Sequence, residues 1–501
     1  MLEASGDTKW AEKGARLFDG ALVGILIVSC LIFYWLSTHG TWDPLYEPQS
    51  SSHPFHFDKG YFFLAQAQAM IHGRLWVKPW ELPGECWIRN GRCYGYFGLT
   101  PSLLRLPLLP VLDHYNRGLT PAYITAALAL ATGSFLAALR HLFSRMRLAQ
   151  STLMLVALVG LSFGAAGVLT QLTPASLYDE AIAWAVGFLS LSVYCFIRWW
   201  ENQQLRWYAL LLASLFLAAN ARPTAVPFAF IIGLGVGYKL WSVRGDGTWA
   251  WAKALSLGGA LIVIPLATCL GVYYVKLGQL IPSYLLNQTI GGLPAFPPWL
   301  TIREIDHDEL VSWRFVPTAL FAYLRPDSVN FTRTSPWVGF RFSDYLAFGR
   351  APIAYVQLRR GSLYAETVSS LTVTMPLALV VFACAAFGVV TSRMKRMGQG
   401  SARQLLRSHV LRSRHLWKVI ALMAAVASWC VVLTGIDVSN RFLGDAYPLL
   451  ALFLLLGLPR LARVVDRGGR VLKTGAIAIV VCGVSWQLFV NIALAWRYGS
   501  G

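Results

Sequence analysis

Apolar runs of about 20 residues recur along the chain, separated by short polar connections. Such a run is long enough to cross the hydrocarbon core of a bilayer as a helix. The runs lack the alternation of apolar and polar residues that strands of a membrane barrel require. The pattern therefore predicts an all-α polytopic membrane protein with about 11 transmembrane helices, at residues 19–37, 119–140, 151–171, 181–199, 206–220, 223–241, 254–275, 369–391, 416–435, 443–459 and 474–494.

Composition agrees with this prediction, since 56% of the 501 residues are hydrophobic and only 13% are charged. A soluble protein carries roughly a quarter charged residues. The net charge of +19 is spread over several short loops rather than interleaved with aromatic platforms, so no nucleic-acid partner is expected. The apolar segment from Gly20 to Leu36 lacks a convincing small-residue cleavage site, which favours an uncleaved first helix.

Lys and Arg residues indicate the orientation, because they gather on the cytoplasmic side of membranes. The strongest basic stretches are "RMKRMGQGSARQLLRSHVLRSRHLWK" and "RLARVVDRGGRVLK", and both become cytoplasmic only if the N-terminus is inside and the C-terminus outside. The single transmembrane domain, 1–501, then has two long external loops with amphipathic juxtamembrane helices, 38–118 and 276–368, and a basic cytoplasmic loop, 392–415. Within the first loop, "TPSLLRLPLLPVL" is short and broken by prolines, so we expect an interfacial or re-entrant segment.

The stretch "FHFDKGYFFLAQAQAMIHGRLWV", residues 55–77, is the first candidate site. On a helical wheel its polar or small residues share one face: Asp58, Tyr61, Ala65, Gln68 and His72. Asp is a preferred helix N-cap, worth about 1 kcal/mol, which is a sufficient structural explanation for Asp58. A carboxylate near apolar surface also gains the basicity that a general base needs.

The turn "TPASLYDEAIAW" carries the adjacent acids Asp179 and Glu180 where a helix begins. The helix macrodipole stabilises acids at this position, which again explains them structurally. Alternatively, the two carboxylates bind a hard cation such as Mg²⁺ or orient an acceptor.

Two later turns place arginines at external helix ends. In "AANARPTAVPF", Arg222 either snorkels to the interface or meets a phosphate. In "GIDVSNRFLGDAYPLL", Asn440 and Arg441 stand among acids. The fork of an arginine suits phosphate, and a salt bridge with a neighbouring acid is the competing explanation.

Cys86 and Cys93 flank a polar turn in "GECWIRNGRC", and a disulfide between them fits an oxidising external side. A metal site is less favoured there because no further Cys or His completes a ligand set. The sequence has no P-loop, no Rossmann fingerprint and no HExxH, so no nucleotide or flavin cofactor is expected. The energy for the reaction must then come from the substrate. Whether a divalent cation is needed is left open by the sequence.

The order of these features resembles the GT-C class of integral-membrane glycosyltransferases, with the aminoarabinose and protein-mannosyl transferases as the nearest relatives. The matching stretches are "DKGYFFLAQAQAMIHG", "YGYFGLTPSLLRLP", the Asp179 turn, Arg222-Pro223-Thr224 and "NRFLGDAYP". The resemblance extends over most of the chain. One departure is Lys59, which stands where many relatives carry a second acid.

This resemblance implies transfer of a sugar from a polyprenyl-phosphate donor to a cell-envelope acceptor (lipid, glycan or protein). The enzyme would lie in the plasma (inner) membrane among membrane lipids, with its active site on the periplasmic or extracellular side. Asp58 would be the general base, and Asp179 would help bind the acceptor or a metal. Arg441, Arg222 and Lys59 would hold the donor phosphate.

Two other functions stay open from the sequence. A transporter or lipid-linked-sugar flippase would place acids and broken helices near the bilayer midplane rather than at external turns. A polysaccharide polymerase or ligase would share the lipid-linked substrates.

Overall fold

The computed structural model describes most of the hydrophobic helices and parts of the connecting loops. The described residues are 4–46, 61–82, 87–115, 118–144, 146, 148–174, 176–244, 248–278, 280, 289–290, 293–294, 313, 316–340, 368–383, 416–434 and 440–500. Asp58, Lys59 and Cys86 lie outside these residues.

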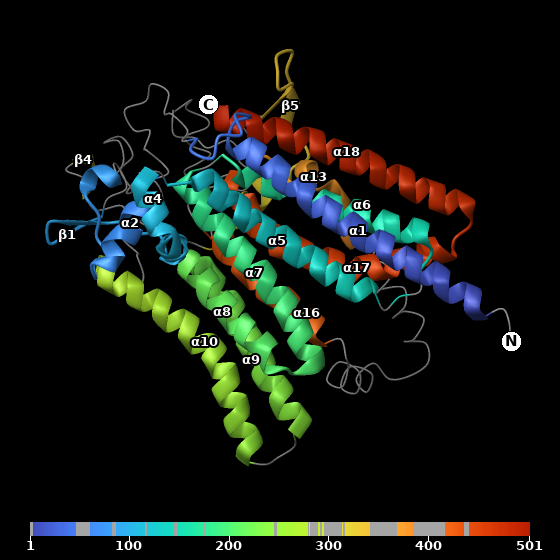
Figure 1. Ribbon diagram of the computed structural model, residues 1–501, viewed down its shortest axis with the longest axis horizontal. Coiled ribbons are helices and arrows are strands. Elements are labelled where there is room, and N and C mark those ends of the chain that lie inside the picture. Colours follow the sequence, from blue (N-terminus) through green and yellow to red (C-terminus); the bar gives the residue numbers. More distant parts are fainter. Residues whose placement is uncertain are drawn as a thin grey trace.

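The described part of the chain is a polytopic helical bundle (Figure 1). Its long helices are α1 (Ala4–Ser37), α5 (Thr120–Phe143), α6 (Gln150–Phe163), α7 (Leu177–Asn202), α8 (Leu205–Ala221), α9 (Val226–Arg244), α10 (Thr248–Leu277), α16 (Leu416–Leu433), α17 (Tyr447–Arg467) and α18 (Arg470–Ser500). The 3-10 segments η3 (Val168–Leu172), η4 (Pro223–Ala225) and η8 (Asn440–Ala446) adjoin α6, α9 and α17.

Nine helices within the described residues are long and apolar enough to cross a membrane, against the predicted number of about 11. Of the other two predicted spans, 206–220 is a helix, α8, but its 17 residues make it short for a full crossing. The span 369–391 is described only as far as residue 383. Its helix is interrupted at Met375: α13 (Leu371–Thr374) ends just before this residue, and helical structure resumes at Pro376, which has no N–H to continue the first helix.

Helices α5 and α7 form the centre of the bundle, and they pack against each other, with α1 beside α5 and α8 beside α7 (Figure 1). Apolar side chains all round α7 are buried, as expected for a helix enclosed by other helices. By contrast, α9 and α10 form a pair that projects away from the central helices (Figure 1).

The loop 38–118 holds α2 (Phe62–Ile71), η1 (Pro79–Glu81), α3 (Thr100–Leu103), η2 (Leu106–Leu108) and α4 (Leu109–Tyr115). It also contains a β-hairpin that the sequence analysis did not predict, β1 (Trp87–Arg89) with β2 (Arg92–Tyr94). Its two-residue turn, Asn90-Gly91, has positive φ at both residues, which is the turn that matches strand twist.

The loop 276–368 holds the short helix α11 (Val316–Leu324) and two further antiparallel pairs, β3 (Thr289–Ile290) with β4 (Leu293–Pro294), and β5 (Val329–Phe331) with β6 (Val338–Phe340). The fold is therefore helical in its bundle but not all-α in its loops. Backbone groups in these loops pair locally as hairpins where no helix forms.

Basic residues gather at one end of the bundle. At the end that carries the N-terminus, Arg140 at the end of α5 binds Asp19 of α1 at 2.7 Å, and His141 contacts Glu201 of α7 at 2.7 Å. The α17–α18 connection adds Arg463, Arg467, Arg470 and Lys473. We call this the basic end. The opposite end, where α2 and α4 lie, is called the α2 end (Figure 1).

Candidate active site

Helix α2 is buried in the protein rather than lying on its surface. Residues Phe62 to Ala67 are buried, Tyr61 and Gln68 are half-buried, and His72 is exposed beyond the end of the helix. The expected amphipathic helix is thus corrected to one that is enclosed on nearly all sides. Gln66, outside the predicted polar face, is fully buried and accepts a hydrogen bond from Ser102 at 2.8 Å.

The N-cap position of α2 is Tyr61. Asp58 and Lys59 precede it by two to three residues and lie outside the described part of the chain, so their roles stay predictions. Tyr61 itself packs into an apolar cluster that includes Phe62, Phe97, Leu177 and Tyr178. The start of α2 is therefore placed against the start of α7.

Aromatic rings make this junction. Phe97 lies 5.6 Å from Phe62 and 5.3 Å from Tyr178, measured between ring centroids, and Tyr96 stacks on Phe97 at 4.3 Å. Tyr178 directly precedes Asp179 in the sequence. The aromatic loop, residues 94–99, thus joins the segment after Asp58 to the turn that carries Asp179.

Asp179 closes the first turn of α7. Ser176 is the N-cap, its hydroxyl accepts a hydrogen bond from the Asp179 N–H at 3.1 Å, and the Asp179 carboxylate accepts from the Ser176 hydroxyl and N–H. This is a reciprocal capping box, which satisfies donors that a helix start leaves open. Asp179 is buried, so the structural explanation for this acid holds, and its role toward an acceptor stays a prediction.

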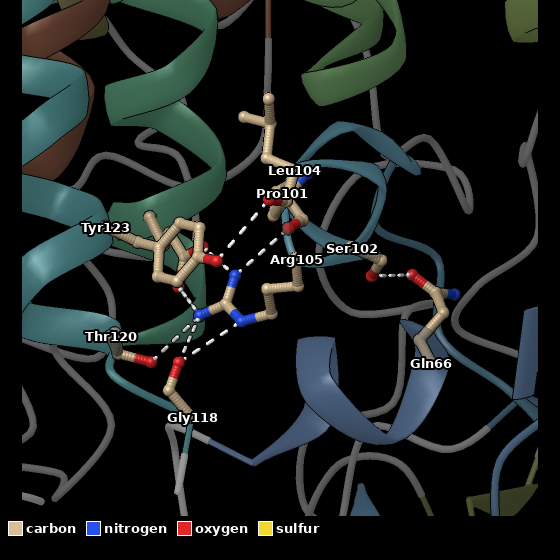
Figure 2. A network of polar contacts seen from close by, with 9 residues as sticks. Gln66, Pro101, Ser102, Leu104, Arg105, Gly118, Thr120 and Tyr123 are labelled. Carbon is tan, nitrogen blue, oxygen red and sulfur yellow. Dashed lines mark hydrogen bonds and ion pairs between the residues drawn. The ribbon is translucent and has the colours of Figure 1, made fainter. Parts of the chain in front are cut away.

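Glu180 forms a fully buried ion pair with Arg105, a residue that the sequence analysis did not single out. Figure 2 shows Arg105 at the centre of this network. Its Nη1 and Nη2 donate to the two Glu180 oxygens at 2.5 and 2.8 Å, and its other N–H groups donate to the carbonyls of Pro101 and Gly118. The guanidinium also lies 4.0 Å from the ring of Tyr123.

Both oxygens of Glu180 are therefore engaged by the protein itself, and Glu180 does not enter the site proposed below. A signal for this pair was present in the sequence. Arg105 stands alone in the apolar stretch "TPSLLRLPLLPVL", and a buried arginine needs a carboxylate or several carbonyls as partners.

Lys276, at the end of α10, holds the aromatic loop from the other side. It is fully buried, and its Nζ donates to the carbonyls of Phe97 at 2.7 Å and Gly95 at 3.2 Å. Gly98 lies against the end of α8, where a Cβ on Gly98 would come within 1.9 Å of the Asn220 carbonyl oxygen. Only glycine allows this approach.

Arg222 follows Asn220 by two residues and turns toward η8. Its Nη1 donates to Asp445 Oδ2 at 2.5 Å, and its guanidinium lies 4.7 Å from the ring centroid of Phe442. The Arg222 side chain is 17% exposed and the Asp445 side chain is 8% exposed. The backbone of Asn440 and Arg441 belongs to η8, while their side chains lie outside what the structure describes.

The predicted disulfide stays a prediction, because Cys86 lies outside the described residues, whereas Cys93 is on β2 and buried. In the described part of the chain, no three side chains of His, Cys, Asp and Glu come together as a metal site. Asp58 and Asp437 are not part of that comparison.

No protein-family model and no curated protein sequence matches this chain. Three solved structures of the oligosaccharyltransferase of Archaeoglobus fulgidus are similar to it. They are the enzyme tethered to an acceptor peptide with the NVT sequon (13% identity, TM-score 0.47), AglB in complex with an inhibitory peptide and a dolichol-phosphate (14%, 0.46), and the apo form (13%, 0.45).

These matches cover 95–96% of this chain and 55–56% of the solved chains, so this chain spans little more than half of their length. At TM-scores below 0.5 and 13–14% identity this likeness carries no argument about the chemistry of this protein, which rests on its own residues.

Proposed function

We propose that this protein is a GT-C-type glycosyltransferase that moves a sugar from a polyprenyl-phosphate donor to a cell-envelope acceptor at the external face of the plasma membrane. One observation carries the proposal: segments that stand far apart in the sequence converge at the α2 end. Tyr61 and Tyr178 share one cluster, Gly98 contacts the end of α8, and Arg222 pairs with Asp445 of η8. These are the segments that bear the motifs.

The proposed reaction is a direct displacement. An acceptor oxygen attacks the anomeric carbon while the bond from that carbon to the phosphate oxygen breaks. The proton of the acceptor passes to the carboxylate of Asp58, and the bonding electrons leave with the lipid phosphate. Arg222, Arg441 and Lys59 stabilise the charge that develops on this phosphate. Asp179 orients the acceptor.

The basic residues that gather at the end with the N-terminus support the external location of the site. The α2 end is separated by the length of α5, 24 residues or about 36 Å, from the basic end. Because basic residues favour the cytoplasmic side, the α2 end is assigned to the outside.

Replacement of Asp58 by Asn tests the proposal. Loss of a general base costs about 10²–10⁴ in rate, so transfer from radiolabelled polyprenyl-phosphate sugars in membranes should fall by at least 100-fold. The matched control is Asp43→Asn in the same loop. Asp43 is exposed and accepts a hydrogen bond from the Leu45 N–H at 2.9 Å, so that variant should keep its activity. Near-normal transfer by Asp58→Asn would rule out the assigned base.

A further inference from the structure

Arg222 has an unusual combination of contacts for an arginine near a protein interior. One face of its guanidinium is covered by Phe442, and one nitrogen donates to Asp445. Among the residues that the structure describes, this is the one hydrogen bond that the Arg222 side chain makes. A guanidinium carries five N–H donors, so most of them have no partner among the described residues.

Arg222 lies where its other N–H donors are close to the rest of the site. Arg222 follows Asn220, whose carbonyl lies against Gly98 of the aromatic loop. Val226, one turn further along, packs with Tyr94, Tyr96 and Tyr273. An anion bound at Arg222 would therefore lie beside the aromatic loop.

We propose that Asp445 is an exchangeable counter-ion of Arg222: it pairs with the guanidinium when the site is empty and yields it to the phosphate of the lipid carrier. The inference rests on the proposed function and adds to it a residue that sets how tightly the site holds lipid phosphate. A phosphate offers two oxygens to the parallel N–H groups of an arginine, whereas Asp445 engages a single nitrogen.

Replacing Asp445 by phosphate as the partner of Arg222 costs free energy, and this cost sets how tightly the site holds phosphate. Asp445 is only 8% exposed, so removing its cationic partner strands a largely buried carboxylate. That penalty is subtracted from the free energy with which phosphate binds. The product of transfer is a phosphate monoester with a charge of about −1.5 to −2, against −1 for the donor diester, so arginine holds the product more tightly. Asp445 thus favours product release.

The direct test compares binding of a fluorescent short-chain polyprenyl phosphate to purified protein in phosphatidylcholine nanodiscs. Asp445→Asn keeps the size and the hydrogen-bond acceptor but removes the charge, and it should bind the probe about tenfold more tightly than the wild type. Arg222→Gln should bind it about tenfold more weakly. The matched control is Asp466→Asn at the basic end, where Asp466 accepts from Ala149 and Thr152. Its affinity should be unchanged.

Kinetics provide a second readout. In the transfer assay Asp445→Asn should lower both KM for the donor and kcat, with stronger inhibition by added polyprenyl phosphate, because release becomes slower. A residue with a purely structural role would lower kcat without tightening inhibition. Unchanged or weaker probe binding by folded Asp445→Asn overturns the exchange.

A measurement on the wild type covers the case in which Asp445→Asn does not fold. Saturating polyprenyl phosphate should increase modification of Asp445 by a carboxyl-directed reagent, measured by peptide mass spectrometry, while polyprenol should not. Asp466 serves as the internal reference. No increase at Asp445 overturns the exchange and leaves the proposed function standing. If the wild type binds polyprenyl phosphate no better than polyprenol, the proposed lipid-phosphate donor is itself wrong.

Discussion

Arg105 and Arg222 both pair with a carboxylate at the α2 end, and the two pairs are built in opposite ways. Arg105 is fully buried and distributes its N–H groups over both oxygens of Glu180 and two backbone carbonyls. Arg222 keeps part of its surface exposed and makes a single hydrogen bond to Asp445 among the described residues. The difference separates an arginine whose contacts hold the fold from one to which we assign a ligand.

The Arg105–Glu180 pair, called the closed pair because protein groups take up its donors, depends on the backbone around it. Prolines break the segment from α3 to α4, which leaves helix-end carbonyls without intrahelical partners. Arg105 donates to one such carbonyl, that of Pro101, and to the loop carbonyl of Gly118, and Glu180 supplies the neutralising charge. A buried pair of this kind contributes little net stability while intact, but breaking it is costly.

Breaking the closed pair should have the largest effect on folding. Glu180→Gln leaves the Arg105 guanidinium buried without its counter-charge, and we expect a loss of about 3–5 kcal/mol in the free energy of unfolding. Thermal unfolding of the detergent-purified protein, followed by size-exclusion chromatography, measures this loss. The double variant Arg105→Gln/Glu180→Gln should recover part of it, because neither charge is then stranded. If Glu180→Gln melted at the same temperature as the wild type, Arg105 would not depend on Glu180 for its counter-charge.

The second prediction concerns the contact between the two regions. A methyl group on Gly98 would overlap the Asn220 carbonyl, so Gly98→Ala must push the aromatic loop away from the end of α8. Overpacking of this kind costs about 1–3 kcal/mol, and misplacement of reacting groups by about 1 Å costs up to about 100-fold in rate. The transfer rate per folded protein should therefore fall by up to about 100-fold, while the free energy of unfolding falls by about 1–3 kcal/mol. Gly469→Ala, in the α17–α18 connection where a Cβ would meet no neighbouring atom, tests whether loss of a loop glycine alone has this effect.

The smallest effect is expected for an exposed ion pair. Arg140 and Asp19 at the basic end are bonded at 2.7 Å, against 2.5 Å in the two buried pairs, but their side chains are 62% and 41% exposed. Exposed pairs contribute about 0.2–1 kcal/mol. Asp19→Asn should lower the melting temperature only slightly, and less at high salt. A loss as large as that of Glu180→Gln would mean that burial does not decide the difference between the pairs.

Much of the bundle was predictable, because a run of about 20 apolar residues has few other ways to satisfy its backbone in a bilayer. Nine predicted spans are helices of spanning length. The hairpin at Asn90-Gly91 was missed, although Asn-Gly is a strong turn signal.

The pairings within the site were less accessible to sequence reasoning. Arg222 and Asp445 are 223 residues apart, and Arg105 and Glu180 are 75 apart, so no local pattern shows which acid each arginine pairs with. A salt bridge between Arg441 and a nearby acid was the alternative considered for the turn before α17, and it stays untested because the Arg441 side chain lies outside what the structure describes, whereas Asp445 of the same turn pairs with Arg222. Long-range partners depend on how the helices pack, which the apolar pattern alone does not specify.

Lys276 has a consequence for how the protein is made. Its two acceptors are carbonyls of the aromatic loop, and the more distant one, at Gly95, is 181 residues earlier in the chain. At about 5–20 residues per second, the ribosome reaches Lys276 roughly 10–40 s after that loop has been synthesised. The aromatic loop therefore lacks its contacts with Lys276 until α10 is inserted. The site is completed late in biogenesis, by a helix that lies C-terminal to the loop.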